Sequence, residues 1–190
     1  MGNHLVVAAV TLTLAHRLDG EMRKDFAAAH ALPGRPDVDA AEHSGPQARV
    51  FLYRVESNAD WRSNVLPTRS PTGQEPQIGL TLQYLVTFVG NEVLQEPQRM
   101  LGSVVRTSGA RPVLARSEIE VMVAAAVAED PQSPFAMVDL MEQPELIRIS
   151  LLPLTLDQLS ALWSSFFHTP YRLSVAYEAS VVLLTAGDNG

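Results

Sequence analysis

The chain has 190 residues, of which 46% are hydrophobic, enough to build the core of one domain or of two small ones. Its 14 Lys and Arg against 21 Asp and Glu give a formal net charge of -7, which excludes the basic surface that holds nucleic-acid phosphates, so no nucleic-acid partner is expected. Cysteine is absent, which excludes disulfides, thiolate metal sites and cysteine nucleophiles.

The chain begins with an apolar segment, Leu5 to Ala15. A membrane-spanning helix needs about 20 predominantly apolar residues, so this segment is too short and no direct membrane span is expected. The residues on either side of it do not match a secretory signal, so we expect a protein made in the cytoplasm without a signal peptide. Apolar residues at helical spacing continue to Met22 and cover much of the circumference, which predicts a helix buried on two sides.

Two stretches of β-forming residues follow this helix. A short strand is expected around Phe26 to Leu32, ahead of a loop rich in Pro and Gly that runs to Pro46. The segment Ala48 to Glu56 carries apolar or aromatic residues on both of its faces, which is typical of a central strand.

A long polar segment, residues 57–77, contains three Pro and several Ser, Thr and Asn. It is expected to be a flexible surface loop that carries Trp61. The next segment, residues 80–90, alternates in the way that predicts a strand. The inward face of this strand consists of Leu80, Leu82, Tyr84, Val86 and Phe88.

Three helices and a strand are predicted in the middle of the chain. Apolar residues at helical spacing predict helices over 97–109, where Pro97 suits the first turn, and over 117–129. Residues 147–154 read as a strand. Thr155 followed by Gln158 matches a capping box, which starts a short amphipathic helix.

The final segment, Tyr171 to Leu184, reads as one strand that is longer than the sheet of a small domain normally covers. Its residues at every second position define a core face with few polar members. That face is predicted to consist of Tyr171, Leu173, Val175, Tyr177, Val181 and Leu183.

From Val181 onward both faces of this strand are apolar, which is not the pattern of a solvated edge. We therefore expect residues 171–177 to pair within the domain's own sheet, and residues 181–184 to be covered by the first helix or by an adjoining subunit. Val182 and Leu184 are the candidate interface residues. An ordinary central strand inside one domain is the alternative.

The order of the predicted elements shows no regular βαβ alternation and no internal repeat. The fold class is therefore α+β, with residues 1–190 forming a single domain and residues 186–190 a flexible end. We expect a mixed or antiparallel sheet of about four to six strands, with about two to four helices packed on it.

The sequence contains no motif for catalysis or cofactor binding. Gly-rich phosphate loops and a GxSxG nucleophile motif are missing, so no catalytic residue, cofactor or enzymatic activity is predicted. The five His are scattered, and no pair has the spacing of a helical metal site. The nearest approach to a ligand cluster is in the Pro/Gly loop, where such charged runs are usually solvated, so no metal is predicted. It consists of Asp37, Asp39, Glu42 and His43.

Aromatic residues supply the remaining candidates for an interaction surface. Trp163 and Phe166 lie on the apolar stripe of the short helix and are expected in the core. Phe167 lies one step around the helix and is the better interface candidate. Trp61 lies in a polar segment, where interface contact and local loop packing are equally compatible with its position.

Four strings together resemble the amino-terminal domain family of the tail-terminator or cap proteins of phage-tail-like contractile injection systems. They occur in the same order and the likeness covers nearly the whole chain, most weakly from Ser117 to Glu145. The strings are LYRVE with the following Asn (Leu52 to Asn58), LTLQYLVT (Leu80 to Thr87), PLTLDQLSALW (Pro153 to Trp163) and PYRLSVAY (Pro170 to Tyr177).

The resemblance implies a structural role without enzymatic activity. Members of this family look like ring-forming proteins that end the inner tube and the contractile sheath distal to the baseplate. The implied partners are tube and sheath subunits and copies of the chain itself, in a ring expected to be a hexamer to match a six-fold tail. The chain departs from the family at Gly109 and Ala110, where bulkier polar residues are expected. Some relatives continue beyond the final strand, so a function of such an extension is not expected here.

Two further functions stay open at the level of the sequence. One is a small-ligand-binding or enzymatic domain with a pocket under the segment 57–77. The segment's length and Trp61 are the only observations that favour it. The other is an adaptor that attaches the injection particle, in the cytoplasm or after release, to another assembly.

Overall fold

The computed structural model describes residues 4–37, 45–58, 77–138, 140, 143 and 146–185. In this part of the chain lie six strands, four α-helices and a 3-10 turn, η1 (Pro134–Met137). The helices are α1 (Val6–Asp25), α3 (Glu96–Ala110), α4 (Arg116–Glu129) and α5 (Leu156–Ser164). The strands are β1 (His30–Pro33), β2 (Gln47–Ser57), β3 (Gln77–Val89), β4 (Val113–Ala115), β5 (Leu146–Leu151) and β6 (Ser174–Thr185).

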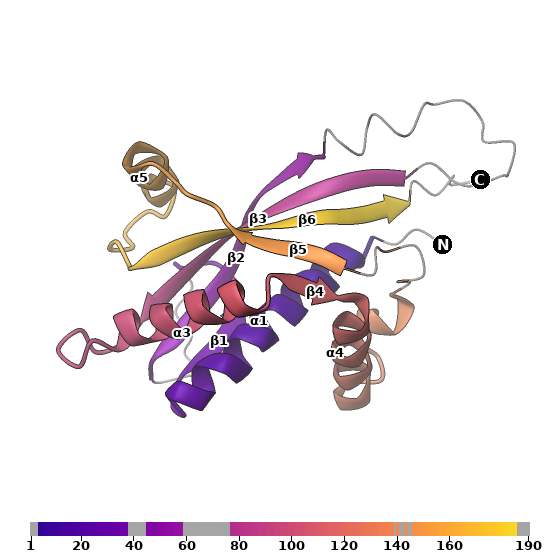
Figure 1. Cartoon of the computed structure of the whole chain (residues 1–190), viewed down its shortest axis with the longest axis horizontal. Helices are drawn as coiled ribbons and strands as arrows, with labels where there is room; N and C mark the ends of the chain where they lie inside the picture. Colours follow the sequence, from indigo (N-terminus) through magenta and orange to yellow (C-terminus); the bar gives the residue numbers. More distant parts are fainter. Residues whose placement is uncertain are drawn as a thin grey trace, which may run out of the picture.

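The six strands form one mixed sheet in the order β1-β2-β3-β6-β5-β4 (Figure 1). Only β1 and β2 are parallel, and the four other neighbouring pairs are antiparallel. Two long strands, β3 and β6, lie at the centre and pair along their whole length. The predicted fold class, α+β with a mixed sheet and helices packed on it, is confirmed for the described residues.

The larger core lies between the sheet and the helices α1 and α3. The inward residues of β3 are those the alternation predicted, and the opposing residues of β6 lie across from them, so Tyr84 faces Tyr177 and Val86 faces Val175. The hydroxyl of Tyr84 is hydrogen-bonded to Thr11 of α1 at 2.9 Å. Many residues of α1 are buried in this core, as predicted for a helix that is apolar around much of its circumference.

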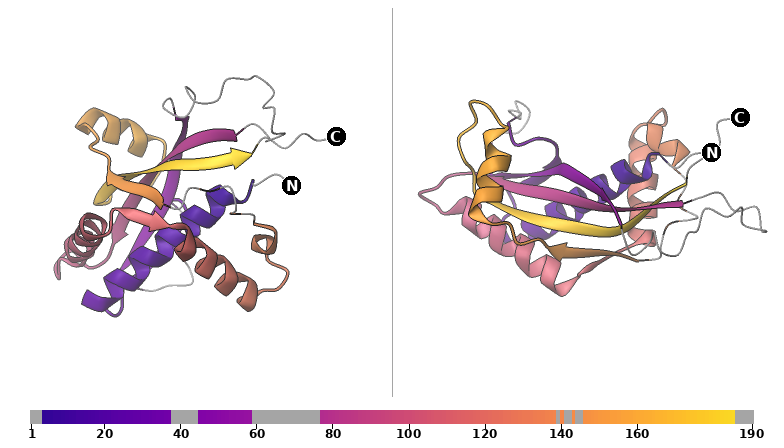
Figure 2. Two further views of the ribbon diagram at one scale, coloured as in Figure 1. Left: turned by 45° about the vertical axis from the view of Figure 1, so that its right-hand side comes forward. Right: turned by 90° about the horizontal axis from the view of Figure 1, so that it is seen from above.

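A smaller core lies on the opposite face of the sheet, where α5 packs (Figure 2). Leu85 of β3 meets Trp163 of α5 and Phe166 just after it, and the ring of Phe51 packs edge-on against Phe166 with centroids 5.7 Å apart. The predicted capping box begins α5, since the Thr155 hydroxyl accepts from the Gln158 amide and the Gln158 side chain accepts from the Thr155 amide. The core positions predicted for Trp163 and Phe166 are confirmed.

The last strand departs from the predicted alternation because of a β-bulge. Leu80 pairs with Val182 and Thr81 with Ser180, so Val181 is the extra residue. The bulge shifts every later side chain to the other face. Val182 and Leu184, rather than Val181 and Leu183, therefore continue the core face, and the predicted face is wrong beyond Tyr177. It is also wrong at Tyr171, which precedes β6 and is 61% exposed.

Smaller differences concern short elements. The strand expected around Phe26 to Leu32 is β1, which starts later because α1 continues to Asp25. The three-residue strand β4 was not predicted, since so short an edge strand shows no alternation. In the described part of the chain, no helix is both long enough and apolar enough to cross a membrane. The loop predicted over 57–77 is shorter at its ends, since Ser57 still belongs to β2 and Gln77 already belongs to β3. Its residues 59–76 and the predicted flexible end, 186–190, lie outside the described residues.

Candidate interaction surfaces

The described residues offer no set of ligands for a metal ion, because no group of three or more His, Asp and Glu comes together there. Of the acidic cluster noted in the sequence, only Asp37 is described. It accepts two hydrogen bonds from the Arg35 guanidinium, at 2.9 and 2.7 Å, which hold the pKa of the Asp37 carboxyl below its usual range. Asp39, Glu42 and His43 lie outside the described residues.

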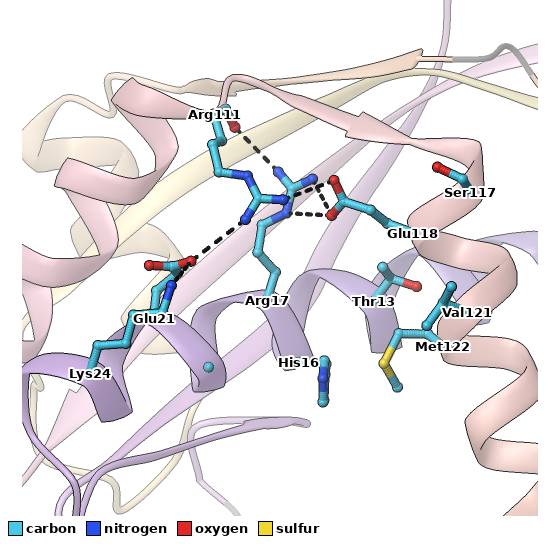
Figure 3. Close-up of a pocket in the computed structure, with 11 residues that line it drawn as sticks. Thr13, His16, Arg17, Glu21, Lys24, Arg111, Ser117, Glu118, Val121 and Met122 are labelled. Atoms are coloured by element: carbon cyan, nitrogen blue, oxygen red, sulfur yellow. Dashed lines mark hydrogen bonds and ion pairs between the residues drawn. The ribbon is translucent and has the colours of Figure 1, made fainter.

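A cavity of about 400 Å³ opens between α1, α4 and the end of α3 (Figure 3). Its charged wall is an ion-pair network. Arg17 of α1 binds Glu118 of α4 at 2.7 Å, and Arg111 bridges Glu118 at 3.0 Å and Glu21 at 3.6 Å. Val121 and Met122 of α4 form part of the opposite wall.

Arg17 is the centre of this network. Its side chain is 6% exposed, and besides Glu118 it donates to the backbone carbonyls of Arg111 and Val113, at 3.2 and 2.7 Å. Buried guanidinium groups need such partners, and here the partners come from three elements of structure. The charges lining the cavity are therefore largely engaged with one another, and the network ties α4 to α1.

A second surface lies around the end of α5. Phe167 is 83% exposed and Tyr171 is 61% exposed, although the Tyr171 ring packs against Trp163 with centroids 5.3 Å apart. Beside them the Arg35 guanidinium lies over the rings of Phe51 and Phe166, at 5.9 and 5.6 Å. Exposed aromatic residues next to Arg are the composition found at protein interfaces.

An arginine without a partner lies below this surface, on the α5 face of the sheet. Arg49 of β2 is only 8% exposed, and none of the described residues gives its guanidinium a hydrogen bond or an ion pair. Its Nη1 lies 3.7 Å from where a side chain at Gly34 would begin. Burial lowers the pKa of Arg49, and the nearby positive charge of Arg172 lowers it further. Arg172 itself donates to the carbonyl of Pro36 at 2.6 Å.

Polar atoms next to Arg49 are also unsatisfied. Thr87 is the residue opposite Arg49 on β3. Its buried hydroxyl and the buried side-chain oxygen of Gln47 have no hydrogen-bond partner among the described residues. Arg49 was not among the interaction residues predicted from the sequence. The available signal was a charged residue on a face shared with Phe51 and Tyr53, in a strand predicted to be buried on both sides.

The four predicted interface residues have different positions. Trp61 lies outside the described residues, as does most of the segment under which a ligand pocket was considered. Phe167 is at the surface. Val182 is fully buried within the chain's own core, and Leu184 packs partly buried against the same core.

The end of β6 is covered on its free edge by a side chain. The amide group of Gln143 accepts from the Leu183 N–H at 3.0 Å and donates to the Leu183 carbonyl, as a neighbouring strand would. This contact removes one backbone pair from the edge on which a further strand could form.

The described residues thus form an α+β domain with exposed aromatic side chains near the end of α5 and an ion-pair network between α1 and α4. Residues 9–189 match the model of the Pvc16 N-terminal domain, and the chain belongs to this family. The match confirms the resemblance to tail-terminator proteins. The comparison with curated proteins gives no match.

Two solved structures are similar to the chain. The first is the sheath/tube terminator of PVC, an extracellular contractile injection system, in its extended state, with 15% identity and a TM-score of 0.57 over 96% of this chain and 57% of that one. The second is the tube-terminating cap of the anti-feeding prophage, with 17% identity and a TM-score of 0.46 over 92% of this chain and 55% of that one. The first similarity shows that the two chains share a fold. The chain spans little more than half the length of either protein.

Proposed function

We propose that the chain is the cap-forming domain of a contractile injection system, which ends the inner tube and the sheath distal to the baseplate. The observation that carries this proposal is the family match, which extends over residues 9–189 and so includes every described helix and strand but the first turn of α1. The fold shared with a sheath/tube terminator supports it. The role proposed is structural and involves no enzymatic step.

The cap acts as a homo-oligomeric ring of six copies, because a closed ring matched to a six-fold tail presents the same surface to each tube and sheath subunit. Such a ring requires each copy to bury part of its surface against its neighbours. The exposed apolar side chains of α4 and of the residues after α5 supply surface of that kind, among them Val121 and Phe167. The protein is thus part of an injection particle.

A deletion experiment tests the proposed function. Particles produced without this protein should have tubes and sheaths of irregular length, or lose their sheath from one end, and the protein supplied in trans should restore uniform length. Electron microscopy of negatively stained particles measures the length distribution. Particles of normal, uniform length in the deletion strain would contradict the proposal.

A further inference from the structure

None of the described residues gives the buried Arg49 guanidinium a hydrogen bond or an ion pair. A guanidinium stays charged in proteins, and a buried charge without a partner is strongly unfavourable. Here Arg49 is 8% exposed and has a second guanidinium, Arg172, close enough to repel it. Two neighbouring guanidinium groups form a site for an anion, and a carboxylate fits their donor geometry.

The surroundings of this site favour a protein as the source of the carboxylate. Phe167 and Tyr171 are exposed, and Arg172 immediately follows Tyr171 in the chain. Aromatic residues and Arg dominate the binding energy of protein interfaces, where a rim of contacts excludes water from the charged pairs. A small free anion would leave these aromatic side chains in water.

The complementary surface occurs on the same chain, on α4. Ile119 is the one residue of this helix that is fully buried, although most of its residues from 119 to 128 are apolar. Val121, Ala124 and Ala125 are exposed. The helix therefore presents exposed apolar side chains that none of the described residues covers.

The end of α4 carries the required charge. Glu129 is the last residue of the helix, Asp130 follows it, and the last turn holds no basic residue. Both side chains are exposed, and Glu129 has no ion pair with any described residue. Negative charge at a helix C-terminus is unfavourable because the helix dipole is negative there, and a cation from a neighbouring subunit would reverse this effect.

The two surfaces lie at opposite ends of the molecule. In Figure 1 and in both views of Figure 2, α5 lies at one end of the sheet and α4 near the other. A contact between two different surfaces of identical chains is a head-to-tail contact, which closes into a ring when the rotation between copies allows it.

We propose that α4 of one copy docks on the α5 side of the next copy, where its terminal carboxylates, Glu129 and Asp130, bind Arg49 and Arg172. The apolar residues of α4 cover Phe167 and Tyr171 in the same contact. This inference rests on the proposed function, because it describes how copies of the cap join into a ring.

Cysteine cross-linking tests the contact directly, because the 190 residues contain no native cysteine. The assembled protein carrying Tyr171→Cys together with Glu129→Cys should form a ladder of disulfide-linked oligomers on mild oxidation. Each single variant should give no ladder, and a mixture of the two single variants should give dimers. A matched control replaces Glu129→Cys by Arg23→Cys, on the exposed surface of α1, and should give no ladder.

Charge variants supply an independent measurement of self-association by sedimentation velocity. Arg49→Gln and Glu129→Gln should each raise the dissociation constant at least about tenfold, since a charged pair at an interface center is lost. Arg23→Gln should leave it within about twofold. Because Glu129 lies at the surface, its replacement should leave the fold intact. Circular dichroism checks that the Arg49→Gln variant is folded.

The outcomes separate this inference from the function it rests on. Rings that form without the 171–129 cross-link, or that tolerate Glu129→Gln unchanged, overturn the contact and leave the cap function standing. A protein that stays monomeric, with and without tail ends, overturns both. Cross-linking of Tyr171→Cys to itself would indicate a two-fold contact and also overturn the head-to-tail arrangement.

Discussion

Replacing Arg17 by Met should destabilise the domain by about 3 kcal/mol. Met keeps an unbranched apolar stem and loses all donors. In the native chain those donors bind Glu118 at 3.1 and 2.7 Å and two backbone carbonyls, of Arg111 and Val113. Removing one partner of a buried ion pair costs about 3–5 kcal/mol. We place the loss at the lower limit because Glu118 is 32% exposed and keeps Arg111 as a second partner.

Urea unfolding followed by circular dichroism measures the free energy of unfolding of the variant. Arg23→Met is the matched control, since Arg23 also lies on α1 but is exposed and paired only with Asp19 at 3.7 Å, so its loss should stay within about 0.5 kcal/mol. A loss below about 1 kcal/mol for Arg17→Met would refute the argument that this network holds α4 to α1.

Three further changes test other parts of the structure. Gln143→Met removes the two hydrogen bonds to the backbone of Leu183, so it should cost about 1–3 kcal/mol and speed hydrogen exchange of the Leu183 amide, whereas unchanged exchange would contradict the contact. Leu85→Ala opens a cavity in the smaller core and should cost about 2–5 kcal/mol by urea unfolding, while the same change at the exposed Leu156 should cost little; equal losses would argue against α5 packing on the sheet. Thr155→Ala removes one half of the capping box and should cost about 1 kcal/mol, and a Ser replacement should recover most of that loss.

Much of the fold could be predicted from the sequence because several elements carry strong local signals. The alternation of β3 gave its inward face, and the pair Thr155 and Gln158 gave the start of α5. The helical spacing correctly predicted Phe166 as a core residue and Phe167 as an exposed one, although α5 ends at Ser164, before both of them. In each case the period of the side chains decides burial.

The remaining features depend on contacts between distant residues. A bulge at Val181 comes from the register of β6 against β3, and no alternation within β6 reveals it. The unpaired state of Arg49 likewise depends on which residues the fold brings close, among them Gly34 and Arg172. The face of a strand that a charged residue occupies can be predicted, but its lack of a partner cannot.

The most direct test of the cap function is a cryo-EM reconstruction of the end of the particle that lies away from the baseplate. The account predicts a closed ring at that end, with one copy of this fold per tube and sheath subunit and with α4 of each copy against the α5 side of the next. A particle end without this fold, or copies of it distributed along the tail, would contradict the account.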